Sequence, residues 1–366
     1  MVDFTEISSR PTAPSEGNSF INPTEGEGLG EGTQGSCDNE PSWRAALAGA
    51  IRDPEELIRR LGLPASLAPG ARQAAAAFPL VVPESFLARM RPGDPTDPLL
   101  RQVLPLGAET ETAPGFTSDP VDDDAATVLP GLLRKYEGRA LLIATGTCAI
   151  HCRYCFRRHF PYESTPKGLS AWQPALDALE SDESIGEVLL SGGDPLVLTD
   201  TALARLLDAL DAIPHLRRVR IHSRLPIVIP ERVTDAFIAR LRHGRLTPFV
   251  VVHANHAAEL VGSCADALSR MVDAGIPVLN QAVLLRGVND TTTAVIELCE
   301  RLTQLRVLPY YLHQLDPVAG AAHFHVPEHR GLEILRAARA RLPGYAVPRY
   351  VRETPGETSK VPIGLL

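Results

Sequence analysis

Cys148, Cys152 and Cys155 stand close together in the segment GTCAIHCRYCF, where they form a C-x3-C-x2-C pattern. Thiolates are soft ligands that suit iron–sulfur clusters. A cubane cluster has four irons, and this motif supplies only three thiolates, so one iron stays open to a further ligand. The spacing is short enough for one loop to carry all three sulfurs. The motif therefore predicts a 4Fe-4S cluster with one open corner.

An open iron corner is the feature with chemical consequences. S-adenosylmethionine (SAM) can chelate such an iron through its amino and carboxylate groups. An electron that a reducing donor supplies to the cluster then breaks the bond between the sulfonium sulfur and C5′ and leaves a 5′-deoxyadenosyl radical. The motif thus predicts radical chemistry that starts from SAM.

A structural zinc site is the alternative for the same cysteines. Structural zinc usually takes four ligands in paired sets of Cys and His, and His151 and His159 would complete such a set, so the number of ligands leaves zinc open. Cys264 and Cys299 lie in helical patterns and are expected in the core, and Cys37 lies in a tail, where we expect no partner for it. The position of the motif after a predicted strand favours the iron–sulfur cluster.

The composition is that of a soluble enzyme and argues against several other classes of protein. Among 366 residues, 44% are hydrophobic, which allows a sizeable core. A formal net charge of -8 argues against non-specific nucleic-acid binding, which needs a basic face. No apolar run approaches the length that spans a bilayer, and the N-terminus lacks a secretory pattern. We therefore expect a cytoplasmic protein without a membrane or nucleic-acid partner.

From Arg139 onward, short apolar or β-branched runs alternate with helical patterns such as TALARLLDALDAI. Such an alternation predicts βα units with a parallel sheet and helices outside it. Six units would form an open, partial (β/α)6 TIM-like barrel, with the chemistry at the carboxyl ends of the strands. The fold class is therefore α/β. The six predicted strands lie at 140–145, 187–191, 217–222, 248–252, 277–285 and 307–313.

The rest of the chain divides into segments of different composition. Residues 1–42 are rich in Gly, Ser, Thr, Pro and Glu and are expected to be a disordered tail. Residues 43–133 combine an N-terminal helical region with a long connector, 102–130, that is expected to pack across the next domain. The barrel is placed at 134–350, and residues 351–366 form a C-terminal extension.

A glycine-rich turn, SGGDPL, follows the second predicted strand. Gly192 and Gly193 would let the backbone approach the methionyl amino group of SAM, and Asp194 would end the turn. Alone, Gly-Gly-Asp also describes an ordinary turn, but one strand after the cysteines it is far more specific. Together, CRYCF and SGGDPL resemble the radical SAM superfamily, and that resemblance implies a barrel of the radical SAM type.

Across about residues 90–366, the chain resembles the lysine 2,3-aminomutase family. The likeness is greatest to the branch that makes (R)-β-lysine for the modification of elongation factor P. The resemblance implies an isomerase that converts L-α-lysine into β-lysine, with a functional link to elongation factor P and its lysine ligase. The motifs that carry it are KYEGRALL, CRYCFRRHFPY, SGGDPL, RIHSRLPIVIP, NQAVLLRGVND, PYYLHQLD, GAAHF and PGETSK.

The resemblance also implies a second cofactor, pyridoxal phosphate (PLP), which enzymes hold through a lysine Schiff base. It places that lysine at Lys360, in PGETSK, although ETS stands before it in place of the glycine run of more familiar members. For the PLP phosphate, it implies Arg139 and Lys135. Lys135 stands where many members have a second arginine, so it would supply a point charge without a bidentate fork.

The same resemblance assigns residues to the substrate and to SAM. Arg157, two residues beyond the last cysteine of the motif, would bind the substrate carboxylate. Asp316 and Glu353 would bind the distal ammonium, and acidic residues at both positions argue against a glutamate substrate, which they would repel. Glu353 is one methylene longer than the usual aspartate. His253 and Gln281, which end the fourth and fifth predicted strands, resemble residues near SAM.

Three other functions stay open on the sequence alone. A 2,3-aminomutase for another amino acid would use the same machinery. A non-catalytic zinc-binding interaction protein would be built on a degenerate barrel, although the intact cysteines, GGDP and Lys360 argue against degeneration. The third is direct action on a lysine residue of elongation factor P. The carboxylate-binding role expected for Arg157 favours a free amino acid over a protein-bound lysine.

Overall fold

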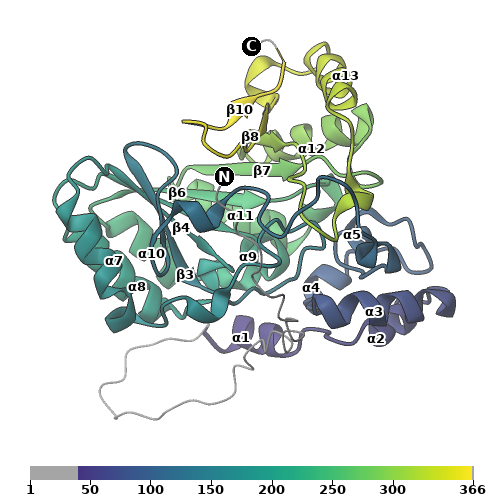
Figure 1. The fold of residues 1–366 in the computed structure, drawn as a ribbon, viewed down its shortest axis with the longest axis horizontal. Coiled ribbons are helices and arrows are strands. Elements are labelled where there is room, and N and C mark those ends of the chain that lie inside the picture. The colour runs from purple at the N-terminus through teal and green to yellow at the C-terminus, as the bar shows by residue number, and fades with distance from the viewer. Residues whose placement is uncertain (1–39, 365–366) are drawn as a thin grey trace, which may run out of the picture. The chain divides into compact units, whose positions relative to one another are not determined.

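The apolar runs of the central sequence form six parallel strands in the computed structural model (Figure 1). Many of their aliphatic side chains are buried, as expected for a sheet that helices cover. Each strand pairs in parallel with the next along the chain, so the predicted α/β core of successive βα units is confirmed. The strands are β3 (Arg139–Thr145), β4 (Glu187–Gly192), β5 (Arg218–Ser223), β6 (Thr247–His253), β7 (Val278–Val283) and β8 (Leu308–His313).

The structure describes residues 40–364, all of which belong to one compact unit. The tail predicted for the first 42 residues lies almost wholly outside the described residues, as does Cys37. The last residues of that predicted tail begin helix α1 (Glu40–Ala48). Within the described range, none of the helices is both long and apolar enough to cross a membrane.

Four short strands that were not predicted extend the sheet at both edges. β1 (Thr127–Leu129) and β2 (Leu132–Leu133) form a hairpin, and β2 pairs antiparallel with β3. β9 (Arg349–Arg352) pairs in parallel with β8, and β10 (Val361–Pro362) folds back antiparallel onto β9. The sheet runs in the linear order β1 to β10, so its first and last strands remain edges and the barrel is open.

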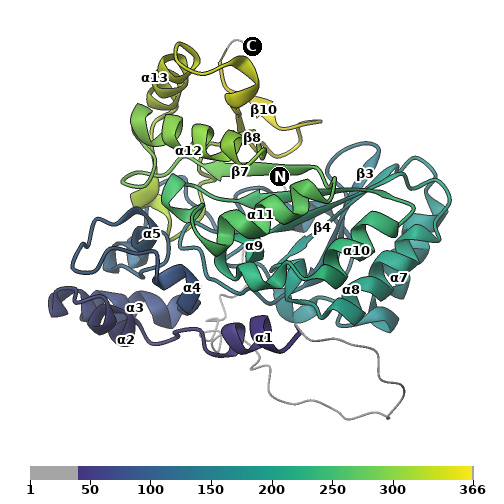
Figure 2. The same cartoon turned by 180° about the vertical axis from the view of Figure 1, so that it is seen from behind.

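The helices that follow the strands pack through one apolar face each. In α8, Leu203, Leu206, Leu207 and Leu210 are buried, at the three- and four-residue spacing of a single helix face. The hydroxyl of Thr199 caps this helix. Figures 1 and 2 show α7, α8 and α10 side by side along the outside of the sheet. These helices are α7 (Leu169–Ser181), α8 (Asp200–Asp211), α10 (Asp235–His243), α11 (Ser263–Asp273), α12 (Thr292–Gln304) and α13 (Glu328–Arg339).

The N-terminal helices share one continuous apolar core with the barrel. Within the predicted N-terminal helical region, the segment DPEELIRRLGLP forms α2 (Pro54–Arg60): the Asp53 carboxylate accepts from the Glu55 N–H at its start, and Gly62, with a φ of 63°, follows its end. Leu57 and Ile58 of this helix are buried. The other short helices are α3 (Ala68–Ala77), α4 (Glu84–Leu87), α5 (Pro98–Arg101), α6 (Asp123–Ala126) and α9 (Leu225–Val228).

The connector between this helical region and the barrel packs across the barrel, as the sequence predicts. The carboxylate of Glu109 pairs with the guanidinium groups of Arg153 and Arg158, at 2.5 and 2.8 Å. The Thr117 N–H donates to the Pro317 carbonyl at 2.9 Å. The connector therefore reaches the loop that follows β3 and the loop that follows β8, where the singled-out residues lie.

Candidate active site

The three clustered cysteines lie in one loop at the carboxyl end of β3, which we call the cysteine loop (residues 146–159). Cys148, Cys152 and Cys155 are each partly exposed, whereas Cys264 and Cys299 are buried in α11 and α12, as predicted for core residues. Burial and the neighbouring thiols raise the pKa of Cys148 well above its usual value and that of Cys155 to about 11. Iron binding at this loop must therefore release thiol protons.

Two glycines at the end of β4 allow this strand to touch the cysteine loop. A Cβ on Gly193 would lie 2.3 Å from the Thr147 carbonyl oxygen, and one on Gly192 would lie 2.6 Å from the Thr145 carbonyl oxygen. The Gly193 and Asp194 N–H groups donate to these two carbonyls, each at 2.8 Å. The sequence predicts that these glycines let the backbone approach SAM. The structure adds a close approach between two backbones, which also requires glycine.

Asp194, which follows these glycines, ties β4 to the loop after β5. Its buried carboxylate accepts from the Ser223 hydroxyl and from the Arg224 N–H, both at 2.7 Å, and from two further backbone N–H groups. Burial raises the pKa of Asp194 to about 6, while these hydrogen bonds oppose the rise. The motif aspartate therefore does more than end a turn: it fixes the backbone of Arg224.

Arg224 lies directly against the cysteine loop. Its Nη1 donates to Cys152 Sγ at 2.7 Å, and its Nη2 donates to Glu259 Oε2 at 2.9 Å and to Gln102 Oε1 at 2.7 Å. Burial alone would lower the pKa of Arg224, but Cys152, Tyr154 and Glu259 raise that pKa well above its usual value. A permanently charged guanidinium thus touches one of the cysteines.

The histidines of the zinc alternative are engaged elsewhere. His151 Nδ1 lies 2.8 Å from the Pro79 carbonyl, and its ring stacks on Phe78 at 4.9 Å. His159 Nε2 lies 3.1 Å from the Ala319 carbonyl. Between residues 40 and 364, no three His, Cys, Asp or Glu side chains converge as a single metal ion requires. A four-iron cube takes one thiolate on each of three irons, so its ligands stand farther apart. The donor set fits the cube better than a single zinc ion.

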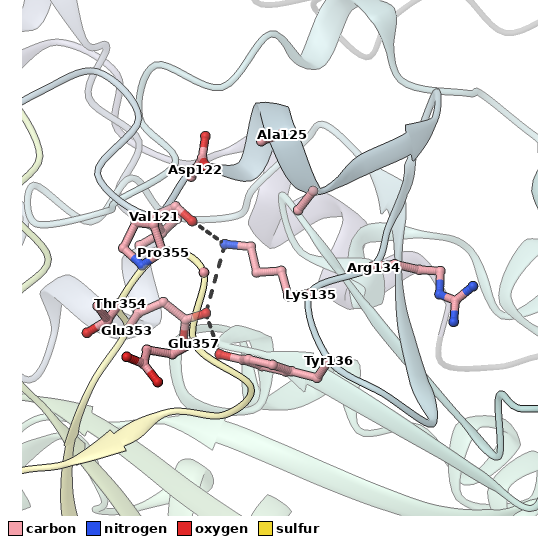
Figure 3. Close-up of a pocket in the computed structure, with 12 residues that line it drawn as sticks. Val121, Asp122, Ala125, Arg134, Lys135, Tyr136, Glu353, Thr354, Pro355 and Glu357 are labelled. Carbon is pink, nitrogen blue, oxygen red and sulfur yellow. Dashed lines mark hydrogen bonds and ion pairs between the residues drawn. The ribbon is translucent and has the colours of Figure 1, made fainter.

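A second group of residues gathers where the β9–β10 hairpin meets the segment before β3. Because Arg352 pairs with Val361 in this hairpin, Glu353 and Lys360 stand opposite each other just beyond the paired residues. Lys360 Nζ donates to Glu353 Oε2, and the Tyr136 hydroxyl donates to Glu353 Oε1 at 2.5 Å. We call Lys135, Tyr136, Glu353 and Lys360 the lysine end of the site; Figure 3 shows the first three.

Asp123, in α6 of the connector, links the lysine end to the cysteine loop. One oxygen of its carboxylate lies 2.8 Å from Lys135 Nζ, and the other accepts from Arg157 Nε at 2.7 Å. Arg157 Nη1 donates to the Ser191 hydroxyl at 3.2 Å. Burial would raise the pKa of Asp123, but Arg157 and Lys135 lower it overall. The residues predicted to bind a carboxylate and a phosphate therefore share one protein carboxylate.

Asp316 and the imidazoles of His222 and His313 lie near enough to Lys360 for its charge to affect their pKa values. Burial, assisted by Glu353, raises the pKa of Asp316 to about 7, although Lys360 opposes the rise. His253 is the last residue of β6, but Gln281 lies within β7 rather than at the strand end where the sequence predicts it. Gln281 Nε2 lies 2.9 Å from His253 Nε2, and burial lowers the pKa of His253 to about 3. This part of the site therefore presents neutral imidazole rather than imidazolium, next to one ammonium and two carboxyl groups.

A cavity of about 220 Å³ opens beside the lysine end. Its walls are the end of α6 and the two residues before that helix, the segment 134–136 and the turn 353–357 of the hairpin (Figure 3). In Figure 3, Lys135 reaches across it from the segment before β3 toward Val121, whose carbonyl lies 2.7 Å from Lys135 Nζ, and toward Glu353. The lysine end therefore has room next to it that no described side chain fills.

Comparisons with known proteins agree with this geometry. Residues 142–299 match the model of the radical SAM superfamily. The L-lysine 2,3-aminomutase of Escherichia coli strain K12 is 46% identical over 332 residues, which cover 89% of this chain and 96% of the relative. The chain belongs to the lysine 2,3-aminomutase family. The proteins of that name from Haemophilus influenzae and Clostridium subterminale are 42% and 34% identical, each over 88% of this chain and over 95% and 77% of their own lengths.

Membership of the lysine 2,3-aminomutase family makes this chain an enzyme of the isomerase class with a radical SAM domain. The superfamily implies SAM and a 4Fe-4S cluster, and the cysteine loop has the donor set for that cluster. Most of the predicted site residues fall into two connected groups. Around the cysteine loop lie Cys148, Cys152, Cys155, Arg157, Gly192, Gly193 and Asp194; nearer the lysine end lie Lys135, Asp316, Glu353 and Lys360.

Arg139 is set apart from the cysteine loop by the length of a strand. It begins β3, whereas the cysteine loop follows the end of β3, roughly 20 Å away at the usual rise of a strand. Its guanidinium lies over the Tyr136 ring, 4.6 Å from the ring centre. Arg139 Nε is buried and hydrogen-bonds to no group among residues 40–364. Arg139 therefore lies at the other end of β3 from the cysteine loop, beside Tyr136 of the lysine end.

Four residues of this family member were missed by sequence reasoning: Asp123, Tyr136, Arg224 and Glu259. Arg224 and Tyr136 stand inside motifs that carried the resemblance, RIHSRLPIVIP and KYEGRALL, but no chemical role was read from them. A usable signal existed for Arg224, because an arginine flanked by a run of apolar residues is commonly buried with a partner. Asp123 lies in the run DDD, where composition alone does not distinguish one aspartate from the next.

Proposed function

We propose that this protein moves the amino group of free L-lysine from C2 to C3 and forms β-lysine, by a radical reaction that starts from SAM at the cysteine loop. One observation carries the choice of lysine. An ammonium group, that of Lys360, already lies against Glu353, close enough to Asp316 to affect the pKa of its carboxyl. A site that holds one alkylammonium against a carboxylate, with a second carboxyl group near enough to sense its charge, suits a substrate that ends in another alkylammonium.

PLP is the second cofactor of this proposal, with Lys360 as its covalent attachment point. When bound, it supplies an unsaturated carbon–nitrogen linkage through which an amino group accepts a neighbouring radical. Three features of the chain support it: the buried Nε of Arg139, which has no hydrogen-bond partner among residues 40–364, the second cation at Lys135, and the cavity that Lys135 lines. Arg139 and Lys135 would hold the phosphate by charge-assisted hydrogen bonds.

The chain's own residues then divide the work of binding and orientation. Arg157 would bind the substrate α-carboxylate, and Asp316 with Glu353 would bind the distal ammonium. Gly192 and Gly193, with the hydrogen-bonded pair of His253 and Gln281, would line the SAM site at the carboxyl ends of the strands. A glutamate substrate would be repelled by the two carboxyl groups, so the arrangement selects against it.

The product would serve the modification of elongation factor P. This part of the proposal, like the (R) configuration of β-lysine, rests on the resemblance of the motifs in CRYCFRRHFPY, RIHSRLPIVIP and PGETSK to the branch with that role. A free lysine substrate fits a site whose Arg157 guanidinium is held by Asp123 and Ser191 and is ready for a carboxylate. A lysine inside a polypeptide has no free carboxylate to offer it.

The test is product analysis on anaerobically reconstituted protein. Lysine labelled with ¹⁵N at the α-amino group is incubated with SAM, PLP and dithionite, and chiral chromatography with mass spectrometry follows the label. We expect (R)-β-lysine with ¹⁵N on C3, and no such product from Lys360→Ala. Other amino acids and elongation factor P, supplied in parallel, test the alternatives. Formation of 5′-deoxyadenosine without any β-lysine would overturn the choice of substrate.

A further inference from the structure

The guanidinium of Arg224 is held through its two Nη atoms, whereas its buried Nε has no hydrogen-bond partner among residues 40–364. Its side chain is 5% exposed, and the Glu259 side chain that pairs with it is fully buried. Gln102 bridges the two: its Oε1 accepts from Arg224 Nη2, and its Nε2 donates to Glu259 Oε1 at 3.0 Å. Asn255 Nδ2 donates to the same Gln102 Oε1 at 2.9 Å. This network fixes the distance between Arg224 and Cys152 Sγ.

The network reaches three separate parts of the chain. Asp194 of the glycine-rich turn accepts from the Arg224 N–H, Gln102 comes from the N-terminal region just after α5, and Glu259 follows β6. Arg89 of the N-terminal region also donates to the Glu259 carbonyl, at 2.5 Å. Burying this guanidinium and its carboxylate partner is costly, because each buried ion must be desolvated. We therefore infer that the position of the Arg224 guanidinium matters to the site.

Charge near a ligand sulfur changes the reduction of an iron–sulfur cluster. Reduction adds one negative charge to the cluster, and a cation that donates to a ligating thiolate stabilises that charge, so it raises the reduction potential. A carboxylate on the same cation acts in the opposite direction, since its own charge opposes the added electron. In a site of low polarity, neither effect is screened as it would be in water.

We propose that Arg224 and Glu259 are positioning residues that together set the reduction potential of the cluster. Arg224 raises the potential through its hydrogen bond to Cys152, and Glu259 limits that rise. The radical reaction needs an electron from a donor of limited strength, so this pair decides which donors can start it. The inference rests on the cluster of the proposed function and not on lysine or PLP.

The test compares midpoint potentials of full-length, reconstituted protein by redox titration followed by electron paramagnetic resonance. Arg224→Gln removes the cation, and we expect a more negative potential. Glu259→Gln leaves the cation uncompensated, and we expect a more positive one. In each case the ratio of reduced to oxidised cluster at a fixed potential should change at least tenfold, which is about 59 mV for one electron. Loosening of the protein would not shift the two variants in opposite directions.

Matched controls keep the test decisive. Arg306→Gln removes a cation from an exposed pair with Asp273 and should leave the potential unchanged. If Arg224→Gln fails to hold iron, Glu259→Gln is compared with the double variant R224Q/E259Q, and the single variant must have the more positive potential. Equal potentials, or shifts of the same sign, would overturn the proposal. Failure of the wild-type protein to bind iron and sulfide would instead count against the proposed function.

Discussion

The cysteine loop and the lysine end hold their charges in different ways. Beside the cysteine loop, Arg153 and Glu259 have fully buried side chains, and each is paired with another protein group. At the lysine end, Lys135 and Lys360 are 20% and 27% exposed, and a cavity lies next to them. The first region is closed around its charges, whereas the second is open to ligands.

This contrast indicates two uses of ion pairs in one barrel. Buried pairs such as Arg153 with Glu109 fix the shape and the field around the cysteines, and a ligand has no route to replace either partner. The pairs of Lys360 with Glu353 and of Arg157 with Asp123 join groups that the proposed ligands need for themselves. Each such pair holds its two side chains in place in the ligand-free protein. We expect a charged group of a ligand to replace the partner that carries the same charge.

The largest expected effects are losses of cofactor and product, and they should differ between variants of the two regions. We expect Cys155→Ala to lose the cluster, and with it both 5′-deoxyadenosine and β-lysine. Lys360→Ala should keep iron, sulfide and slow SAM cleavage while losing PLP absorbance and β-lysine by roughly 10³-fold or more, as for residues that act as a unit. Iron analysis, visible spectra and chromatography measure these quantities, with the exposed Lys167→Ala as the control. Loss of iron in Lys360→Ala would break the separation.

The next largest expected difference is in the free energy of unfolding that a substitution costs in each region. Glu109→Gln leaves the buried guanidinium groups of Arg153 and Arg158 without their counter-ion, so we expect unfolding to become easier by about 3–5 kcal/mol. Glu353→Gln keeps a hydrogen-bond acceptor for Tyr136 and Lys360 beside an open cavity, so we expect a loss of about 1 kcal/mol or less. Urea unfolding of both variants measures the two values, and equal losses would contradict the contrast.

The two regions also differ in how far they could be predicted from the sequence. The six central strands were predictable because each has six or seven residues with apolar side chains in a run or in alternation, between helical patterns. β2 and β10 contain two residues each, too few for any alternation to appear, and they form only because neighbouring strands offer free edges. The cysteine loop was predictable because its chemistry depends on spacing within one short segment.

The lysine end could not be derived from spacing, because its residues come from distant parts of the chain. Glu353 and Lys360 meet through a hairpin whose second strand is not visible in the sequence, and Tyr136 joins them from more than two hundred positions away. Only the resemblance to a family singled out Lys360. The resemblance did not single out Asp123, because only the turn of α6 decides which aspartate of DDD is buried.

Asp123→Asn tests the link between the two regions. We expect weaker lysine binding by about 10- to 100-fold, because Arg157 and Lys135 each lose a charge-assisted partner that holds them in place. Titration of the PLP absorbance with lysine measures the affinity, and Asp124→Asn, at the exposed neighbouring position, is the matched control. Tighter binding in Asp123→Asn would instead mean that Asp123 competes with the substrate carboxylate.

The smallest expected effect is a pH dependence at the lysine end. Burial and Glu353 raise the pKa of Asp316 to about 7, against the opposing effect of Lys360. Only the ionised carboxylate attracts the substrate ammonium, so lysine affinity should fall about tenfold from pH 8 to pH 6, as the ionised fraction falls. The same spectroscopic titration measures it, and Asp316→Asn should bind weakly with no such dependence. The midpoint potential of the cluster should not follow this titration.

The sign of the accompanying stability change gives an independent check. A carboxyl whose pKa is raised in the folded protein keeps a proton that the unfolded chain has already released between about pH 4 and pH 7. Its contribution to stability is therefore present at low pH and is lost as the pH rises through about 7. Asp316→Asn removes that loss, so at pH 8 the ligand-free variant should be more stable than the parent by roughly 1 kcal/mol or more. A variant that is less stable at pH 8 would show that Lys360 keeps Asp316 ionised, and the affinity should then stay constant over the same range.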